Sequence, residues 1–237
     1  METAARTVSR PAAWSGPALP ARPAKIARTM EITYLGLSCL RLRGRDVQVL
    51  VDPPAATLPG LGRSHPDIIV RTEGETVPEL LRHREGQPQE VSGPGEFEVR
   101  GVTIHGLPAG ETTIMRIEVD DVCVTVLGRL DRQLTEEEVD VLGRVDVLAV
   151  PVGGVDALGA VAATQVVNAI APAIVVPVRY RSSGVAGSGD YDPLEKFAKE
   201  MGLTEGTLTS QPKLTLTGAM GAAEDTRVVA LEPRTGV

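Results

Sequence analysis

Two short, wholly apolar segments constrain the fold of this chain more than any other feature. They are VLAVPV at residues 147–152 and AIVVPV at residues 173–178. Segments of this length without a polar face are typical of strands that are buried on both sides, in a sheet that helices cover. Helical patterns surround them, at residues 135–143, 158–171 and 192–202. The pattern of the second half of the chain therefore predicts helices that alternate with strands. Thr135 and Glu138 are expected to cap the first of these helices.

The first half of the chain has short strand-like segments separated by Gly, Pro and Asp. Strands are expected at residues 31–36, 39–44, 47–53 and 67–70, within 89–108, in a hairpin over 112–128, and near the end at 213–218 and 227–233. The first three predict an antiparallel meander, and Asp120-Asp121 predicts the turn of the hairpin. A short helix is expected over residues 77–84. Together these patterns indicate an α/β fold in which helices cover sheets, in four layers.

The domain organisation follows from a change of composition near residue 30. Residues 1–29 are rich in Ala, Pro and Arg and show no periodicity, so we expect a disordered extension. An organelle-targeting peptide and an upstream start codon, with Met30 as the functional beginning, are both open explanations. The chain of 237 residues is long enough for one sizeable core, so residues 30–237 are expected to form a single domain.

Composition narrows the classes of function. The net charge is −7 and aromatic residues make up 3%, which gives no support to nucleic-acid binding. No apolar stretch reaches 18 residues, so a membrane is not an expected partner either. Cys39 and Cys123 are the two cysteines; we expect reduced core residues, with a disulfide as the alternative. These features favour a cytoplasmic protein.

Five segments resemble metallo-β-lactamase-fold (MBL-fold) hydrolases, in particular the small bacterial zinc-dependent hydrolase-like proteins. They are MEITYLGLSCLRLRG (30–44), VLVDPP (49–54), GPGEFEVRGVTIHGLP (93–108), VLGRVDVLAVPVGG (141–154) and AIVVPVRY (173–180). The resemblance covers about residues 30–232. It implies a four-layer αββα metallo-β-lactamase sandwich, with zinc ligands on loops at one edge of the sheets.

The resemblance also implies where the zinc ligands should stand, and most positions hold other residues. The family motif His-x-His-x-Asp-His falls on residues 73–78, where Glu73 and Glu75 replace two histidines, Val77 the aspartate and Pro78 the last histidine. A further histidine is expected after Leu107-Pro108, in a loop that is shortened in this chain.

Three positions outside that motif also differ from the family. Leu37 and Arg179 stand where the family has histidines, and Arg129 stands at the bridging aspartate. Only Asp52 matches. We therefore expect no catalytic residue, no metal ligand and no cofactor, zinc being the metal of the family.

The substituted residues suggest an ion-pair network in place of a metal centre. Arg129 and Arg179 bring two positive charges to a cleft that also receives Asp52, Glu73 and Glu75. The alternative is that the arginines point to solvent. A third possibility is that the carboxylates bind a hard cation such as Mg²⁺.

Three functions are consistent with this pattern. The first is an MBL-fold, hydrolase-like protein that is catalytically inactive and acts by binding or in an assembly. The alternative is a metal-dependent hydrolase of the same superfamily that acts on an ester, phosphodiester or lactam through a rebuilt site. A third is an anion-binding module in which Arg71, Arg129 and Arg179 hold a phosphorylated or carboxylated ligand. The expected partner is thus a protein or a small anionic ligand, and the sheet edges also permit a homo-oligomer.

Other candidate sites carry less chemistry. His65, His83 and His105 show no ligand spacing, so they are interpreted as surface or hydrogen-bonded histidines. The glycine-rich segment PVGGVDALGA at residues 151–160 is interpreted as a place of tight packing, with anion binding at a helix start as the alternative.

Overall fold

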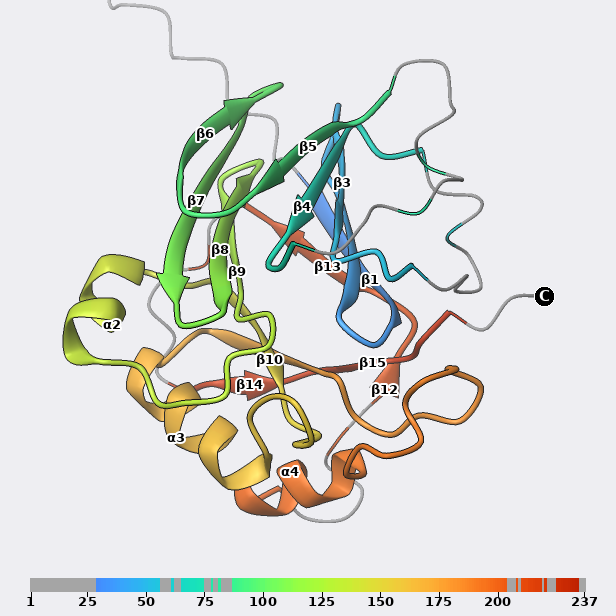
Figure 1. Cartoon of the computed structure of the whole chain (residues 1–237), viewed down its shortest axis with the longest axis vertical. Helices are drawn as coiled ribbons and strands as arrows, with labels where there is room; N and C mark the ends of the chain where they lie inside the picture. The colour runs from blue at the N-terminus through green and yellow to red at the C-terminus, as the bar shows by residue number, and fades with distance from the viewer. Residues whose placement is uncertain are drawn as a thin grey trace, which may run out of the picture.

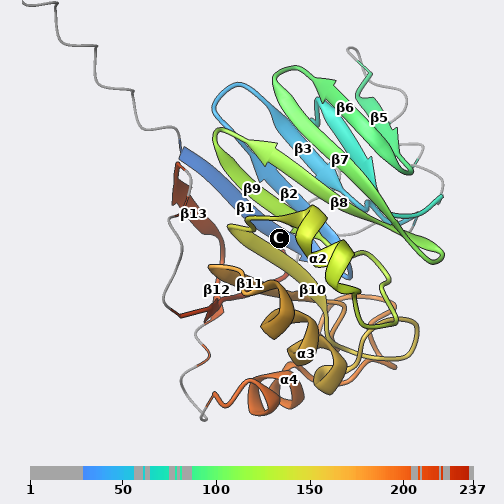
Figure 2. The same cartoon turned by 90° about the vertical axis from the view of Figure 1, so that its left-hand side faces the viewer.

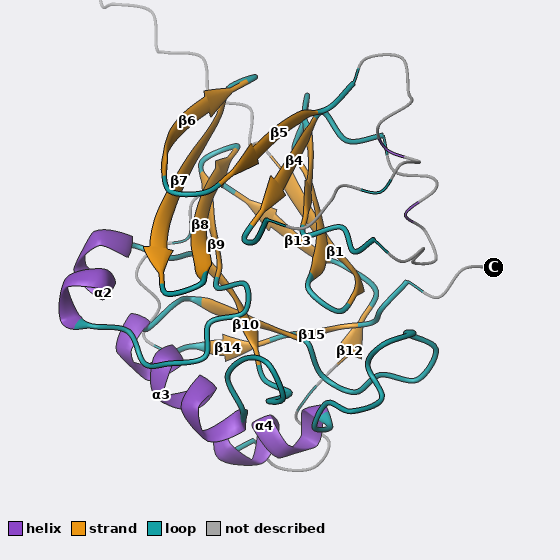
Figure 3. Ribbon diagram, in the orientation of Figure 1, coloured by secondary structure: helices purple, strands orange, loops and turns teal. Residues whose placement is uncertain are grey.

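Two β-sheets packed face to face form the centre of the molecule (Figures 1 and 3). The structure is a computed structural model. It describes residues 29–234 apart from 56–60, 62–64, 75–77, 79–80, 82–86, 204–207, 209, 219 and 221–224. Residues 1–28 of the predicted extension and most of the helix expected over residues 77–84 therefore lie outside the described residues.

The first sheet has six strands in the order β13-β1-β2-β3-β4-β5. Their bounds are β1 Thr29–Gly36, β2 Cys39–Arg43, β3 Gln48–Val51, β4 Ile68–Arg71, β5 Gln89–Ser92 and β13 Leu214–Thr217. Strands β1, β2 and β3 form the predicted antiparallel meander, whereas β4 and β5 run parallel to β3. The first strand includes Thr29, one residue before the predicted domain start.

The second sheet has seven strands in the order β14-β11-β10-β9-β8-β7-β6. Their bounds are β6 Gly95–Val99, β7 Val102–Ala109, β8 Thr112–Val119, β9 Val122–Val126, β10 Val147–Pro151, β11 Ile174–Val178 and β14 Arg227–Val228. Asp120 and Asp121 both have positive φ, 50° and 68°, as the predicted hairpin turn requires. Strand β12 (Ser210–Gln211) pairs with β15 (Ala230–Leu231) in a separate ribbon.

The described helices lie outside the second sheet, and the last of them packs against the one before it (Figure 2). They are α2 Glu136–Leu142, α3 Ala160–Ile170 and α4 Leu194–Glu200. The predicted capping box is present, since the Thr135 side chain accepts from the Glu138 N–H and the Glu138 side chain accepts from the Thr135 N–H. No described helix is long and apolar enough to cross a membrane.

The core is aliphatic and lies mainly between the two sheets. Alternate residues of a strand point to opposite faces, and in β3 Val49 and Val51 face the second sheet while Leu50 faces outward. On that outer face Leu50 packs in a smaller cluster with Leu61 and Leu81, so the first sheet is also covered on both sides. Both cysteines are buried and free, which confirms that they are reduced core residues.

Candidate functional site

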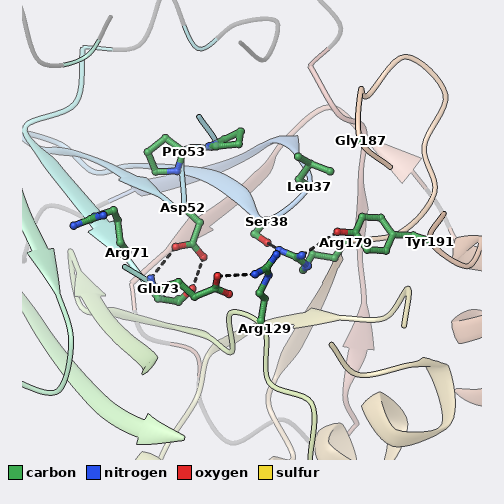
Figure 4. Close-up of a pocket in the computed structure, with 12 residues that line it drawn as sticks. Leu37, Ser38, Asp52, Pro53, Arg71, Glu73, Arg129, Arg179, Gly187 and Tyr191 are labelled. Carbon is green, nitrogen blue, oxygen red and sulfur yellow. Dashed lines mark hydrogen bonds and ion pairs between the residues drawn. The ribbon is translucent and has the colours of Figure 1, made fainter. Parts of the chain in front are cut away.

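The loops that follow the central strands of both sheets meet at one edge and enclose a pocket of about 160 Å³ (Figure 4). Asp52 follows β3, Thr72 and Glu73 follow β4, and Arg179 follows β11. Neighbouring parallel strands bring their carboxyl ends to the same edge, which is where open α/β sheets place their ligands. The pocket therefore lies at the edge that the resemblance assigned to the metal ligands.

Arg179 is the most buried charged residue of this pocket, with 9% of its surface exposed. Its Nη1 donates to Ser38 Oγ at 2.9 Å, and its Nη2 donates to the Tyr191 hydroxyl at 2.9 Å and to the carboxylate of Asp156. The guanidinium carbon also lies 5.5 Å from the centre of the Tyr191 ring. Arg179 does not point to solvent, because each of these contacts holds it inside the protein.

The main chain fixes Arg179 as firmly as its side chain does. Its N–H donates to the carbonyl of Leu37 at 2.8 Å, which ties the end of β11 to the turn between β1 and β2. Its φ of 53° lies in the left-handed region, and a Cβ added to Gly153 would lie 2.0 Å from the Arg179 carbonyl oxygen. The glycine-rich segment thus provides the close approach that was predicted, with Gly153 against the Arg179 backbone.

Arg129 forms the predicted ion pair with Glu73. The distance from Arg129 Nη1 to Glu73 Oε2 is 3.2 Å, and Arg129 Nη2 lies 3.0 Å from Asp156 Oδ2. Figure 4 shows the Arg129 and Arg179 side chains converging beside Ser38. Because Asp156 Oδ2 contacts both guanidinium groups, one carboxylate joins the two arginines into a network.

Sequence reasoning missed Asp156. The residue stands in the glycine-rich segment between β10 and α3, which was interpreted only as a packing element. The Asp156 N–H donates to the Gly154 carbonyl at 2.9 Å across Val155, whose φ is 67°. This arrangement is a γ-turn with positive φ at a β-branched residue, a rare and strained conformation. The signal available in the sequence was an acidic residue in a glycine-rich loop, in a chain with arginines at two of the family's ligand positions.

Asp52 is held by neutral donors, and within the described residues it forms no ion pair with the arginines. The Thr72 N–H and the Thr72 hydroxyl each donate to one Asp52 oxygen, both at 2.8 Å. Burial raises the pKa of Asp52 to about 6; the two Thr72 hydrogen bonds and the charge of Arg179 act against this rise, and the charge of Glu73 adds to it. The prediction of an ion-pair network is therefore wrong for Asp52.

Arg71 lines the pocket but turns away from its centre. Figure 4 shows its side chain directed away from Arg129 and Arg179. Its Nη2 lies 3.8 Å from Glu90 Oε2 on β5. The predicted triad of ligand-binding arginines is thus reduced to two that lie together.

The remaining predicted positions have diverse environments. Leu37 lines the pocket with a φ of 55°, and Pro78 is buried. Glu75 and Val77 lie outside the described residues. The shortened loop after Leu107-Pro108 is confirmed, because β7 passes into β8 through Gly110-Glu111 alone.

The histidines do not contribute to this pocket as far as the structure describes them. His65 is exposed, and His83 lies outside the described residues. His105 stands on β7, where its Nδ1 lies 3.7 Å from Glu96 Oε1 on the paired strand β6. The interpretation of His105 as a surface histidine with a polar neighbour agrees with this position.

A family model for the β-lactamase superfamily domain matches residues 31–179, more than half of the chain. The chain belongs to the metallo-β-lactamase superfamily. Its two mixed sheets, with helices outside, are the αββα sandwich of that fold. A search of curated proteins found no match.

Solved structures of the superfamily have the same fold over most of their length. A protein assigned as a Zn-dependent hydrolase from Thermotoga maritima is 23% identical, with a TM-score of 0.69 over 86% of this chain and 99% of that one. A metallo-hydrolase from Ignicoccus hospitalis is 19% identical, with a TM-score of 0.59 over 81% and 100%. An isothiocyanate hydrolase from Delia radicum gut bacteria is 13% identical, with a TM-score of 0.55 over 79% and 98%. At these identities the likeness shows the fold alone.

The described residues of this metallo-β-lactamase-fold chain do not fit the metal centre that the superfamily implies. A zinc site needs imidazole, thiolate or carboxylate ligands, and among the described residues no group of three or more such side chains could hold a metal ion. Two guanidinium groups are fixed at the edge where a cation would bind, and they already contact Glu73 and Asp156. Both oxygens of Asp52 accept hydrogen bonds from Thr72.

Proposed function

We propose that this chain is a metallo-β-lactamase-fold protein that acts by binding a partner or ligand, without metal-dependent hydrolysis. The observation that carries the proposal is the Arg129–Asp156–Arg179 network at the carboxyl ends of the strands. A fixed positive charge repels a metal ion at short range, and a carboxylate that already accepts from two arginines is a poor ligand for one. The network therefore places positive charge at a site where a metal centre requires neutral or negatively charged ligands.

The backbone around the pocket supports a retained binding role. Leu37, Asp52, Val155 and Arg179 all have positive φ and lie in or beside the pocket. Such conformations cost on the order of 1 kcal/mol each and persist at functional sites. Strained backbone and a pocket thus occur together at this edge, although the side chains differ from the metal ligands of the family.

The competing function is a hydrolase with a rebuilt site, and Asp52 is the observation that favours it. A buried carboxyl group whose pKa is about 6 is suited to general acid–base chemistry near neutral pH. Both oxygens of Asp52 already accept hydrogen bonds from Thr72, and no group of metal ligands stands among the described residues. We therefore place it second.

Metal analysis combined with activity assays separates the two functions. Untagged protein is analysed by inductively coupled plasma mass spectrometry and assayed on chromogenic ester, phosphodiester and lactam probes, with and without chelator. We expect far less than one zinc per chain and no hydrolysis above background. About one zinc or more per chain, with hydrolysis that chelator abolishes, would overturn the proposal.

We further propose that the protein works in the cytoplasm. Cys39 and Cys123 are both buried and unpaired, which is typical of proteins in a reducing compartment. Fractionation of the native cell, with the chain detected by antibody, tests the location; detection outside the cytoplasm would contradict it.

A further inference from the structure

Arg129 and Arg179, which both line the pocket, converge on the carboxylate of Asp156 at its border with a neighbouring hollow. Asp156 belongs to a short surface loop. We propose that the pocket binds the carboxylate group of a small monocarboxylic acid, which replaces the Asp156 side chain between Arg129 and Arg179. This role rests on the proposed function, because it needs a protein that binds without a metal centre.

The donors around Asp156 form a cradle suited to a carboxylate. Arg129 and Arg179 present planar forks of N–H groups, which match the geometry of a carboxylate. Ser38 Oγ and the Tyr191 hydroxyl each accept from Arg179. Each hydroxyl therefore keeps its own proton, which it is able to donate to a bound acid.

Asp156 fills this cradle incompletely. Its Oδ2 contacts both arginines, whereas its Oδ1 is buried and has no hydrogen-bond partner within the described part of the chain. Arg179 Nε is likewise buried without a partner among the described residues. An acid that enters from the pocket and uses both of its oxygens supplies acceptors that Asp156 does not. The internal carboxylate is therefore a replaceable occupant.

The loop that carries Asp156 holds a strained residue next to it. Its γ-turn holds Val155 at a φ of 67°, with 74% of that residue exposed. Release of Asp156 from the arginines allows this strained residue to relax. The Asp156 side chain itself is 30% exposed, so it has a path to solvent.

The pocket restricts the size and charge of the acid. Its volume of about 160 Å³ is below the roughly 300–1,000 Å³ of pockets for drug-sized ligands. Pro53, Pro54 and Leu37 give it an apolar wall for a short hydrocarbon tail. Asp52 and Glu73 also line it, and they disfavour a second negative charge on the ligand. A monoanion is therefore preferred to a dianion such as phosphate.

The proposed exchange of the Asp156 side chain for a bound acid is tested by calorimetric titration of propionate into the full chain. The ionic strength is held constant with sodium chloride. The Asp156→Asn variant keeps the shape of the side chain and removes the competing charge. Because the apparent Kd rises as the binding-competent fraction falls, we expect propionate to bind this variant about tenfold more tightly than the wild type. Asp131→Asn makes the same chemical change at an exposed residue on the neighbouring pocket wall, and it should leave the Kd unchanged.

Two further variants locate the binding site. Arg179→Gln should abolish binding, and Ser38→Ala, which removes one hydroxyl and leaves both arginines, should weaken it. Circular dichroism checks that each variant is folded, and Ser38→Ala decides the location if Arg179→Gln unfolds. Unchanged affinity in Ser38→Ala would then overturn the assignment.

Other outcomes also decide against the exchange. Absence of saturable propionate binding by both wild type and Asp156→Asn overturns it, as does equal tightening by Asp131→Asn. Inorganic phosphate that binds as tightly as propionate overturns the choice of a monocarboxylate. Metal content is measured on the same preparation. Bound zinc would contradict the proposed function, whereas metal-free protein that does not bind propionate would contradict only the exchange with Asp156.

Discussion

The two sides of the pocket hold their carboxylates by different means. On the side of the first sheet, Asp52 accepts hydrogen bonds from the neutral donors of Thr72, and burial raises its pKa to about 6. On the side of the second sheet, Asp156 lies between the guanidinium groups of Arg129 and Arg179. The same edge therefore holds one carboxyl group through neutral hydrogen-bond donors and another through two positive charges.

Removal of Arg179 should produce the largest effect, because it leaves Asp156, Ser38 and Tyr191 without their common partner. Breaking a largely buried pair on one side costs about 3–5 kcal/mol, so Arg179→Ala should lower the free energy of unfolding by about that amount. Urea unfolding followed by circular dichroism measures it.

A surface ion pair provides the matched control for Arg179. Arg132 pairs with Glu138 at 2.6 Å, but 41% of its side chain is exposed, so Arg132→Ala should cost less than about 1 kcal/mol. Equal losses in the two variants would contradict the view that Arg179 is buried and holds several partners at once.

The stability of the protein should depend on pH through Asp52. The folded pKa of Asp52, about 6, lies above the value of about 3.9 in an unfolded chain. Between these values the folded protein binds more protons than the unfolded chain, so Asp52 lowers the free energy of unfolding as the pH rises from about 4 to about 6. The full difference is about 2–3 kcal/mol.

Asp52→Asn isolates that contribution, because the amide stays neutral at every pH. The stability of wild type minus that of Asp52→Asn should fall between pH 4 and pH 6 and then level off. Urea unfolding at several pH values measures both proteins. A difference that stays constant over this range would show that Asp52 titrates normally.

Loss of the Thr72 hydroxyl should have a smaller effect on stability and a definite effect on Asp52. Thr72→Val removes one of the two hydrogen bonds that stabilise the ionised carboxylate, at a cost of about 1–2 kcal/mol. The pKa of Asp52 should rise above 6, as followed by NMR of its carboxyl carbon. Thr72→Ser keeps the hydroxyl and should keep the pKa; a lower pKa in Thr72→Val would refute this account of the Asp52 side.

Arg71→Gln should have the smallest effect. Its ion pair with Glu90 is loose, at 3.8 Å, and lies away from the other two arginines. We expect a change of no more than about 0.5 kcal/mol in urea unfolding. A loss as large as that of Arg179→Ala would place Arg71 in the network and remove the distinction between the arginines.

The fold could be predicted from the sequence because its signals are local. The apolar strands around residues 147–152 and 173–178, the Asp120-Asp121 turn and the Thr135 capping box each specify their own structure. The ion pair of Arg129 with Glu73 was also predicted, from the positions that the family resemblance gave to both residues.

The rest of the site depends on contacts between distant segments. Asp156 meets Arg129 and Arg179 only because the loop after β10 folds back over the ends of the strands, through a turn that strains Val155. Nothing in the pattern of a glycine-rich loop says which way its one acidic side chain points. Asp52 was assigned to the arginines because its negative charge could be read from the sequence. The sequence did not show that the Thr72 N–H and hydroxyl would donate hydrogen bonds to it.

A crystal structure of the protein grown with excess zinc tests the central claim most directly. The account predicts that Asp156 lies between Arg129 and Arg179, and that no metal ion is bound at the ends of the strands. A zinc ion within about 2.0–2.3 Å of protein ligands at this pocket would contradict it.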